Sequence, residues 1–365
     1  MPDTSKRKTK FSKKKIRKLV WTFIFIAFSA GVIIATAVNE FSGSNEAANL
    51  NDVKLNGWLL IPATLCFLVM ITLEYAKYVL MVRKLTKPNT FKLAEAWKLA
   101  FRTVMIGRYY DKITPAAVGG QPAQILNMRR TGKLGNGLAT AIPIFSMISG
   151  QAMFILVAVP IFLFSGMIMT NPVLITTAWI GLLFYAFWPV MVIGTVFFPK
   201  PTAKLINLVI RLLAKIHIIK NRNQALRKVE EEVDGYAENV KLIAKKPKVF
   251  SGVMLMSLLS NTLVASIPYF VLKAFGGDIG FWESFALTVA VDAAVYFAPT
   301  PGNSGVAEGT FYVVFSRLST GYVFWAMMIW RLFSYYIYII MGPIIYLLMH
   351  LEKRRKKEGK NDHSK

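Results

Sequence analysis

Three ionisable residues lie inside otherwise apolar stretches of the sequence. Asp292 is in the middle of Leu287–Val295, Glu308 follows a Pro-Gly-rich segment, and Arg331 is about ten residues into the run 322–349. A charged side chain at the centre of a bilayer costs roughly 2.5–3.5 kcal/mol on insertion scales, so such residues usually pair or face a wet cavity. Two interpretations of Arg331 therefore stay open: an ion pair with Asp292 or Glu308, or a contact with the charged headgroup of a substrate.

Each half of the chain also contains a Pro-Gly-rich break within apolar sequence. The first break lies within 107–122 and the second within 297–309. Pro115 and Pro301 are expected to stop a helix, and the glycines behind them permit left-handed or closely approached backbone. Irregular backbone at membrane depth is tolerated only where it is buried in protein or lines a wet cavity. Two such breaks in corresponding positions indicate a transporter-like binding site; two packing turns without a ligand are the alternative.

A fresh helix behind each break would point its N-terminus at the middle of the protein. We expect these helices to start after Gly120 and after Gly305, with several free N–H groups each. Helix N-termini carry about half a positive charge and bind phosphate or carboxylate groups well. Together with Arg108, Lys112 and Arg331, these termini predict a site for an anion.

Other kinds of site have no support in the sequence. The histidines, His217, His350 and His363, are scattered without metal-ligand spacing. No phosphate-binding loop of the Gly-x-x-x-x-Gly-Lys-Ser/Thr type and no serine nucleophile elbow is present. We therefore expect no catalytic residue, no metal and no cofactor, and movement of a substrate that runs downhill or is coupled to an ion or proton gradient.

The elements that must position these residues are membrane spans. Hydrophobic residues make up 55% of the 365-residue chain, and several apolar runs reach the roughly 20 residues that cross about 30 Å of hydrocarbon. The predicted fold is all-α, a polytopic membrane helical bundle with six full spans and two broken or re-entrant segments. The spans are predicted at 19–38, 57–82, 138–166, 173–198, 249–275 and 322–349, and the broken segments at 91–127 and 283–316. The first run is too long for the core of a cleaved signal peptide, so we expect it to be retained.

Positive charge gathers between the predicted spans. Of a formal net charge of +25, nine Lys or Arg residues lie in 1–18, six in 83–102, twelve in 199–248 and seven after His350. Because Lys/Arg excess marks the cytoplasmic side, we predict basic cytoplasmic tails at 1–18 and 350–365. They flank a transmembrane domain at 19–349 with a cytoplasmic amphipathic loop at 199–248. The basic stretches flank membrane spans, so they fit anionic lipid headgroups better than nucleic acid, and we expect a bacterial plasma membrane.

Six spans place both ends of the chain on one side if each broken segment enters and leaves by the same face. The first segment would dip in from the cytoplasm and the second from outside. This opposite entry is what an inverted repeat predicts. Two kinked full crossings, which would give eight spans with the same orientation of the ends, are the alternative.

Several of these residues match a family pattern. The motif Tyr109-Tyr110, Thr114-Pro115, Gly119-Gly120 and Gln124, followed by Pro299 to Gly309, Arg331 and Gly342-Pro343, resembles the transmembrane region of lysylphosphatidylglycerol synthases, a flippase-like integral membrane family. The resemblance covers nearly the whole chain, and the second motif is its more specific part. Many members carry Asp and Arg where this chain has Gln121 and Gln124, so one acid and one base are missing from the first motif. The candidate substrate-binding residues are Arg108, Tyr110, Lys112, Pro115, Gly119, Gly120, Gln121, Gln124, Asp292, Pro301, Gly302, Asn303, Gly305, Glu308 and Arg331.

The resemblance implies a domain that moves a lipid across the bilayer: aminoacylated phosphatidylglycerol in full-length synthases, and polyprenyl-linked sugars or other lipids in stand-alone members. Full-length synthases add a soluble aminoacyltransferase domain, whereas this chain ends about 15 residues after the last predicted span. We therefore expect a flippase-like transporter of an anionic or aminoacylated phospholipid or a polyprenyl-linked lipid. The alternatives are a phosphatidylglycerol lysyltransferase-type protein, tied to antimicrobial-peptide resistance and dependent on a separate catalytic domain, and a non-transporting scaffold. The expected partners are lipids with anionic headgroups and a lipid-modifying or envelope-synthesis enzyme, not nucleic acid.

Overall fold

The computed structural model describes residues 55–164, 171–197, 242–316 and 323–362, together with the isolated positions 31, 34, 204 and 208. Regular structure within these ranges is helical, which confirms the predicted all-α class. The β-type contact among the described residues is a single antiparallel bridge that pairs Pro115 with Pro301. The predicted tail 1–18, the first span 19–38 and the loop 199–248 as far as residue 241 lie outside the described residues, apart from the isolated positions.

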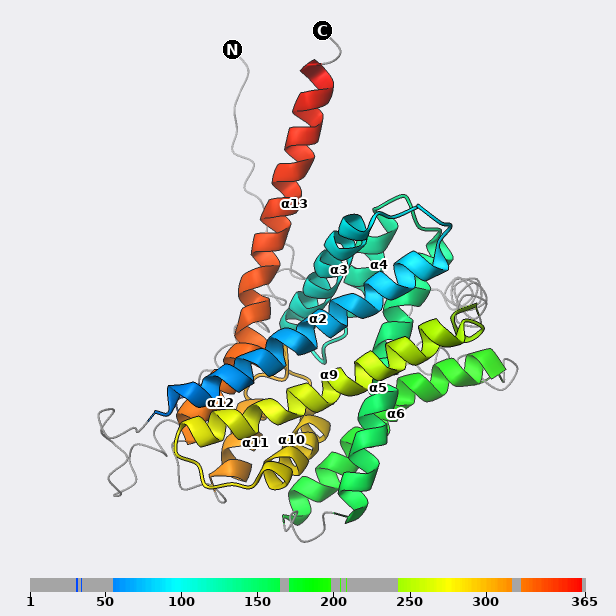
Figure 1. Cartoon of the computed structure of the whole chain (residues 1–365). Helices are drawn as coiled ribbons and strands as arrows, with labels where there is room; N and C mark the ends of the chain where they lie inside the picture. Colours follow the sequence, from blue (N-terminus) through cyan, green and yellow to red (C-terminus); the bar gives the residue numbers. More distant parts are fainter. Residues whose placement is uncertain are drawn as a thin grey trace, which may run out of the picture.

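Five helices of the described part are long and apolar enough to cross a membrane. They are α2 (Leu60–Leu85, preceded by the 3-10 turn η2, Gly57–Leu59), α5 (Asn136–Phe164), α6 (Pro172–Phe197), α9 (Pro247–Ala274) and a composite last span. The last span consists of α12 (Val323–Arg331), the π-helical segment η3 (Leu332–Tyr336) and α13 (Ile337–Asp362). These helices confirm five of the six predicted spans (Figure 1).

The two broken segments form helical hairpins. The first hairpin is α3 (Leu93–Ile113) and α4 (Gly120–Arg129), and the second is α10 (Phe281–Val295) and α11 (Val306–Phe315). In the first, Lys133 just behind α4 pairs with Glu95 at the start of α3 at 2.9 Å, so the chain returns to the side from which it entered. A helix of ten residues, as α4 and α11 both are, rises only about 15 Å, half of the hydrocarbon thickness. The segments are therefore re-entrant hairpins and not kinked crossings.

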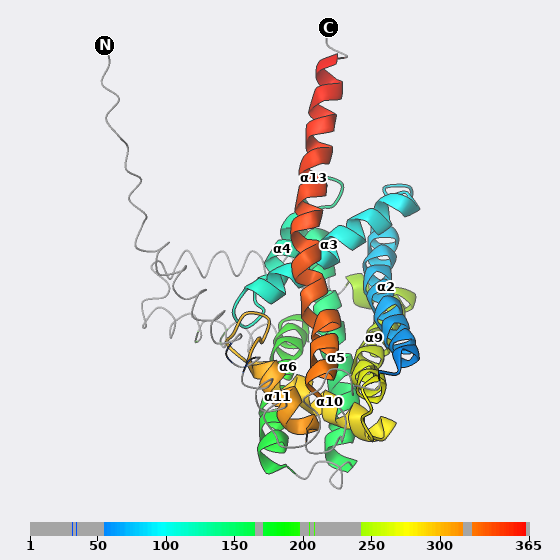
Figure 2. The same cartoon turned by 90° about the vertical axis from the view of Figure 1, so that its left-hand side faces the viewer.

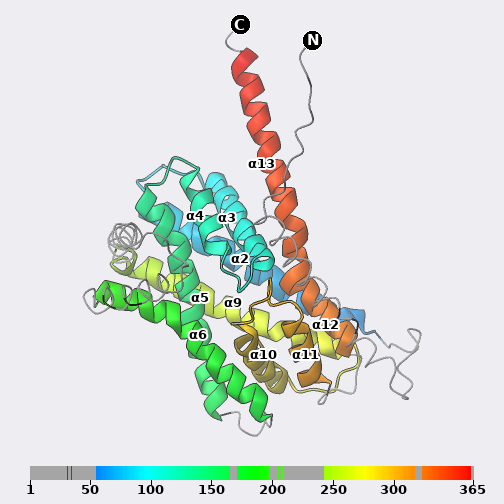
Figure 3. The ribbon, with the colours of Figure 1, turned by 180° about the vertical axis from the view of Figure 1, so that it is seen from behind.

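The hairpins belong to an inverted repeat. The order α2, α3, α4, α5 recurs as α9, α10, α11 and the last span, and Gly120 and Val306, which open α4 and α11, are 186 positions apart. Helices α2 and α9 pack side by side and run in opposite directions (Figures 1 and 3). The Asn56 N–H at the start of α2 donates to the Ala274 oxygen at the end of α9, at 2.8 Å. One hairpin therefore enters from each end of this central pair, as the sequence predicted.

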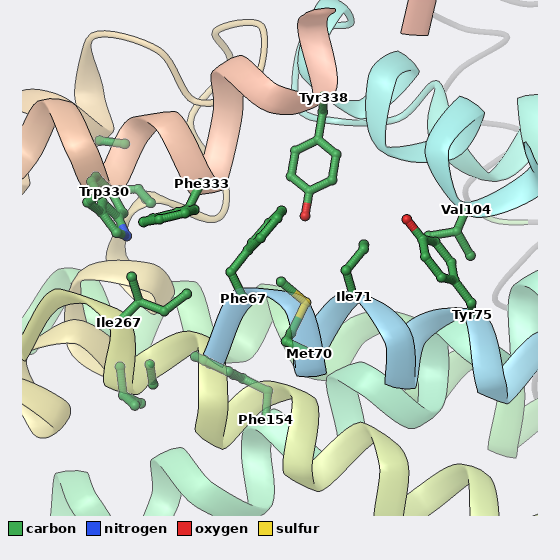
Figure 4. Packing of buried hydrophobic residues seen from close by; sticks show 14 of the residues in the cluster. Phe67, Met70, Ile71, Tyr75, Val104, Phe154, Ile267, Trp330, Phe333 and Tyr338 are labelled. Atoms are coloured by element: carbon green, nitrogen blue, oxygen red, sulfur yellow. The ribbon is translucent and has the colours of Figure 1, made fainter. Parts of the chain in front are cut away.

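Aromatic packing fixes the last span against the central pair. Figure 4 shows Phe67 and neighbouring side chains of α2 facing Phe333 and Tyr338 of the last span. The ring centroids of Phe67 and Phe333 are 5.3 Å apart, within the range of favourable aromatic pairs. The π-helical turn η3 follows Arg331 directly, and such turns are often found at functional sites.

One end of the bundle is strongly basic, and we call it the basic side. It comprises the end of α2, the start of α3, the loop behind α4 and the start of α9. Lys246, directly before α9, donates to the Lys84 carbonyl at 2.5 Å. Glu352 of α13 joins this end through ion pairs with Lys98 at 2.8 Å and Arg102 at 2.6 Å. Helix α13 then continues to Asp362, through most of the predicted tail, and projects beyond the other helices (Figures 1 and 2).

Candidate functional site

The tips of the two hairpins meet inside the bundle. Pro115 and Pro301 pair as an antiparallel bridge, although they are far apart in the sequence. A Cβ atom added to Gly302 would also lie 3.0 Å from the Lys112 carbonyl oxygen, so the second tip touches the end of α3. The sequence predicted that the helix behind each break points its N-terminus at the middle of the protein, and the bridge shows that the two breaks lie against each other.

Both tips have the same backbone design. Thr114–Ala117 and Thr300–Asn303 each begin with Thr-Pro and close with an N–H donated to the threonine carbonyl, at 3.2 and 3.1 Å. The two residues after each proline are left-handed, with φ of 52° and 50° in the first tip and 58° and 59° in the second. In the first tip these residues are Ala116 and Ala117, which rarely adopt positive φ.

The two predicted roles of the glycines, left-handed backbone and close approach, are divided between the two breaks. Gly302 and Gly305 have positive φ, whereas Gly119 has a φ of −83°. In the first break the glycines allow close approach instead. A Cβ atom on Gly120 would lie 2.0 Å from the Asp111 carboxylate, which accepts the Gly120 N–H at 2.9 Å.

The expectation of free N–H groups at the two helix N-termini is wrong for three residues. The Gly119 N–H donates to the Thr114 hydroxyl at 2.9 Å, and the Gly120 N–H is taken by Asp111. The Gly305 N–H donates to the Glu308 carboxylate at 2.7 Å. The protein thus supplies its own negative groups at both termini, and an anion finds fewer open donors than the sequence indicated.

Arg331 forms a buried ion pair with Glu308. Its Nη2 lies 2.7 Å from the Glu308 Oε2, and the two side chains are 3% and 2% exposed. The same carboxylate caps α11, so it joins the second tip to the last span. Of the two interpretations of Arg331, the structure supports the ion pair, with Glu308 and not Asp292 as its partner.

A second buried ion cluster, which is not among the predicted site residues, lies on α2 and contacts α9 and α3. Lys77 and Glu74 of α2 pair at 2.8 Å, and Lys77 also donates to the Ser257 hydroxyl of α9 at 3.1 Å. Lys77 is 1% exposed, so a side chain that reaches toward the membrane surface is ruled out. Arg108 of α3 lies 3.4 Å from Glu74 with its own side chain 39% exposed. The (i, i+3) spacing of Glu74 and Lys77 was the available signal.

Four charged residues beside the tips are only half-buried, and we call them the polar centre: Arg108, Asp111, Lys112 and Asp292. Asp292 of α10 acts electrostatically on Lys112 of α3, as do Asp111 and Arg108. In the described part of the chain, neither Lys112 nor Asp292 has an ion-pair partner of its own. Charges from both halves of the repeat therefore converge, and two of them are available to a ligand.

The tips also carry buried polar atoms without a protein partner. Four of them lie on the breaks or next to them: Gln121 Oε1, Thr300 Oγ1, Asn303 Oδ1 and Ser304 Oγ. Buried polar groups are normally hydrogen-bonded, so a cluster of exceptions indicates contact with water, an ion or a ligand. Gln121 and Asn303 were among the predicted site residues, whereas Thr300 and Ser304 were missed.

Two predicted residues lie apart from the polar centre. Tyr110 makes edge contacts with Tyr109 and with Tyr346 of α13, at 5.5 and 6.3 Å. Gln124 is buried and accepts a hydrogen bond from Tyr78 of α2 at 3.0 Å. Both residues hold the first hairpin against spanning helices.

The inverted repeat, the paired re-entrant tips and the charged centre between them define a polytopic membrane protein with two re-entrant hairpins. Residues 21–342 match the family described as the lysylphosphatidylglycerol synthase TM region, and the chain belongs to this family. It is also similar to a UPF0104 membrane protein of Archaeoglobus fulgidus, with 22% identity over 320 residues that cover 86% of this chain and 94% of the relative. No solved structure shows a significant match.

Proposed function

We propose that this protein moves a phospholipid between the leaflets of its membrane, with the headgroup handled in the polar centre. The observation that carries the proposal is the contact of the two tips at Pro115 and Pro301, beside the half-buried Lys112 and Asp292. Irregular backbone and accessible charges at membrane depth are tolerated where they line a polar path. Membership of a family named after the transmembrane region of a lipid synthase supports a phospholipid as the substrate.

The balance of charge favours a headgroup that carries both signs. Four cations (Lys77, Arg108, Lys112 and Arg331) are matched by four carboxylates (Glu74, Asp111, Asp292 and Glu308). A purely anionic headgroup would leave one charge uncompensated in a region of low dielectric constant, which is unfavourable. We therefore favour a headgroup with a phosphate and an ammonium, as in aminoacylated or ethanolamine phospholipids. The phosphate would contact Lys112 and Arg108, and the ammonium would contact Asp292.

Two buried ion pairs outside the polar centre hold the helices in place. Arg331–Glu308 holds the second tip to the last span. Lys77, paired with Glu74 on α2, donates to Ser257 and so joins α2 to α9. No bond of the lipid is broken or formed. The acyl chains stay in the hydrocarbon while the headgroup exchanges water for the side chains of the polar centre.

Leaflet exchange in liposomes tests the proposal. The purified protein would be reconstituted with lipids that carry a fluorescent acyl chain and an ethanolamine, alanyl-glycerol or glycerol headgroup, and a membrane-impermeant quencher would report exchange. We expect faster exchange for the first two headgroups. Lys112→Ala and Asp292→Asn should each slow it about tenfold, the effect of losing one charged hydrogen bond. Lys273→Ala, which removes an ion pair with Asp278 outside the site, is the control. Exchange no faster than in protein-free liposomes, or unaffected by Lys112→Ala, would contradict the proposal.

A further inference from the structure

An apolar groove of about 480 Å³ lies beside the second tip. Its walls come from the first turns of α6, the end of α10, the second break and one face of α11. Lining side chains include Val173, Thr177, Ala294, Phe297, Thr310 and Val313. The Thr177 hydroxyl donates to the Val173 carbonyl of its own helix at 2.7 Å. An apolar ligand in the groove therefore leaves no hydrogen bond of Thr177 unmade.

The groove opens on the outside of the described helices. Val173 on one wall is 69% exposed, and Phe297 and Val313 on the others are 38% and 46% exposed. Because it is formed by the start of α6 and by α11, it lies in the half of the bundle away from the basic side. In a membrane protein such a surface faces hydrocarbon, and apolar recesses exclude water and accept apolar ligands.

The groove is lined by the same segment, α10 through α11, that carries Asp292 and Glu308. Ala294 in the groove is two residues from Asp292. Gly309, also in the lining, directly follows Glu308, which is paired with Arg331. The segment from α10 through the second break to α11 therefore carries ionisable side chains as well as the apolar lining of the groove, and a phospholipid likewise has a charged and an apolar part.

Within the described residues, the corresponding face of α4 in the first hairpin is closed. The positions 186 residues before Thr310 and Val313 are Gln124 and Asn127 of α4, which are 8% and 7% exposed. Tyr78 donates to Gln124 at 3.0 Å, and Asn127 donates to Thr103 at 2.8 Å. Of the two short helices α4 and α11, the groove therefore lies on α11, and the matching positions of α4 are closed by hydrogen bonds to α2 and α3.

We propose that this groove binds one hydrocarbon chain of a phospholipid whose headgroup lies at the polar centre. The proposal rests on the proposed function, because it assigns the second part of the same substrate. Its volume falls within the range of ordinary ligand sites, about 300–1,000 Å³. An acyl chain bound in this groove keeps the headgroup of its lipid near the tips. The protein would therefore bind its lipid from the leaflet away from the basic side.

Photolabelling tests the site directly. The protein would be reconstituted with phosphatidylethanolamine that carries a diazirine on one acyl chain, and the labelled residues would be identified by mass spectrometry after irradiation. We expect labelling concentrated on α11 and on the first turns of α6. Thr310→Phe and Thr177→Phe, which fill the groove from opposite walls, should each reduce this labelling at least fivefold, and Thr310→Leu should give a smaller reduction. Leu255→Phe, at a position of α9 that is 57% exposed, should leave it unchanged.

The outcomes separate the groove from the transport activity. Labelling spread evenly over exposed positions, or unchanged by both groove-filling substitutions, would overturn the chain site even if leaflet exchange is fast. Labelling that is concentrated in the groove and blocked by both substitutions would support it even if no exchange is measured, in which case the transport proposal alone fails. Thermal unfolding of each variant in detergent shows that the labelled protein is folded.

Discussion

Arg331 and Glu308 are separated from water almost completely and are joined at 2.7 Å. The same carboxylate oxygen, Glu308 Oε2, also accepts the Gly305 N–H at 2.7 Å, so it satisfies a helix terminus and a guanidinium at once. Lys112 has a similar charge but no ion-pair partner among the described residues, and it is half-buried. The surroundings of each cation thus separate a structural role from a ligand-binding role.

The buried pair predicts a large and non-additive effect on stability. Arg331→Met leaves the Glu308 charge buried without its partner, and we expect a loss of about 3–5 kcal/mol in the free energy of unfolding. Replacing both residues by Met should cost clearly less than the two single losses added together, because no unpaired charge remains. Unfolding in detergent with increasing SDS measures both. Additive losses would show that the two side chains do not depend on each other.

At the scale of elements, the tip of the second hairpin has little room. Gly302 has a φ of 58°, and a Cβ atom there would lie 2.4 Å from the Tyr335 ring of the π-helical segment η3. Gly132, in the loop behind α4, has a φ of 65° with nothing within 4 Å of its Cβ position. The two glycines share a backbone strain and differ only in their neighbours.

This contrast predicts different results for the same substitution. Gly132→Ala should cost about 1–2 kcal/mol, the strain of an L-residue in left-handed backbone. Gly302→Ala should cost more and should also slow leaflet exchange, because the tip must move away from Tyr335. Unfolding and leaflet exchange would be measured for both variants. A double variant, Gly302→Ala with Tyr335→Ala, removes the ring and so isolates the part of the effect that is due to the contact with Tyr335. Equal effects of the two alanines on exchange would exclude a functional role for the tip packing.

The spans and the two breaks could be predicted from sequence because each depends on local properties. Apolar length fixed the spans, and Pro115 and Pro301 marked the breaks. The ion-pair partner of Arg331 could not be chosen from the sequence, because Asp292 and Glu308 are both carboxylates inside apolar sequence. Only the folded structure shows which of them lies within reach of Arg331. The left-handed Ala116 and Ala117 were missed because alanine gives no sign of positive φ. The π-helical turn behind Arg331 likewise has no pattern of its own.

At the scale of the molecule, the repeat is symmetric in its backbone and asymmetric in its charges. Helices α4 and α11 have equal length and the same Thr-Pro turn before them. Arg108, however, corresponds to Ala294, and Asp292 corresponds to Ile106, 186 positions apart. The symmetric backbone brings the two tips together, and the unequal side chains contribute Arg108, Asp111 and Lys112 from one half and Asp292 from the other. Both signs of charge are therefore present, which suits a headgroup with two opposite charges.

The ends of the bundle differ in charge, and this difference predicts its orientation. We expect the basic side to face the cytoplasm, because Lys and Arg are retained there during insertion. Cysteines at two exposed loop positions report this with a membrane-impermeant maleimide: Lys87→Cys behind α2 on the basic side, and Asp278→Cys between α9 and α10. The native Cys66 is partly buried inside α2, so the parent protein serves as the control for background labelling. In intact cells Asp278→Cys should be labelled and Lys87→Cys only after permeabilisation. The reverse result would place the acyl-chain groove in the cytoplasmic leaflet and would reverse the leaflet from which the lipid is taken.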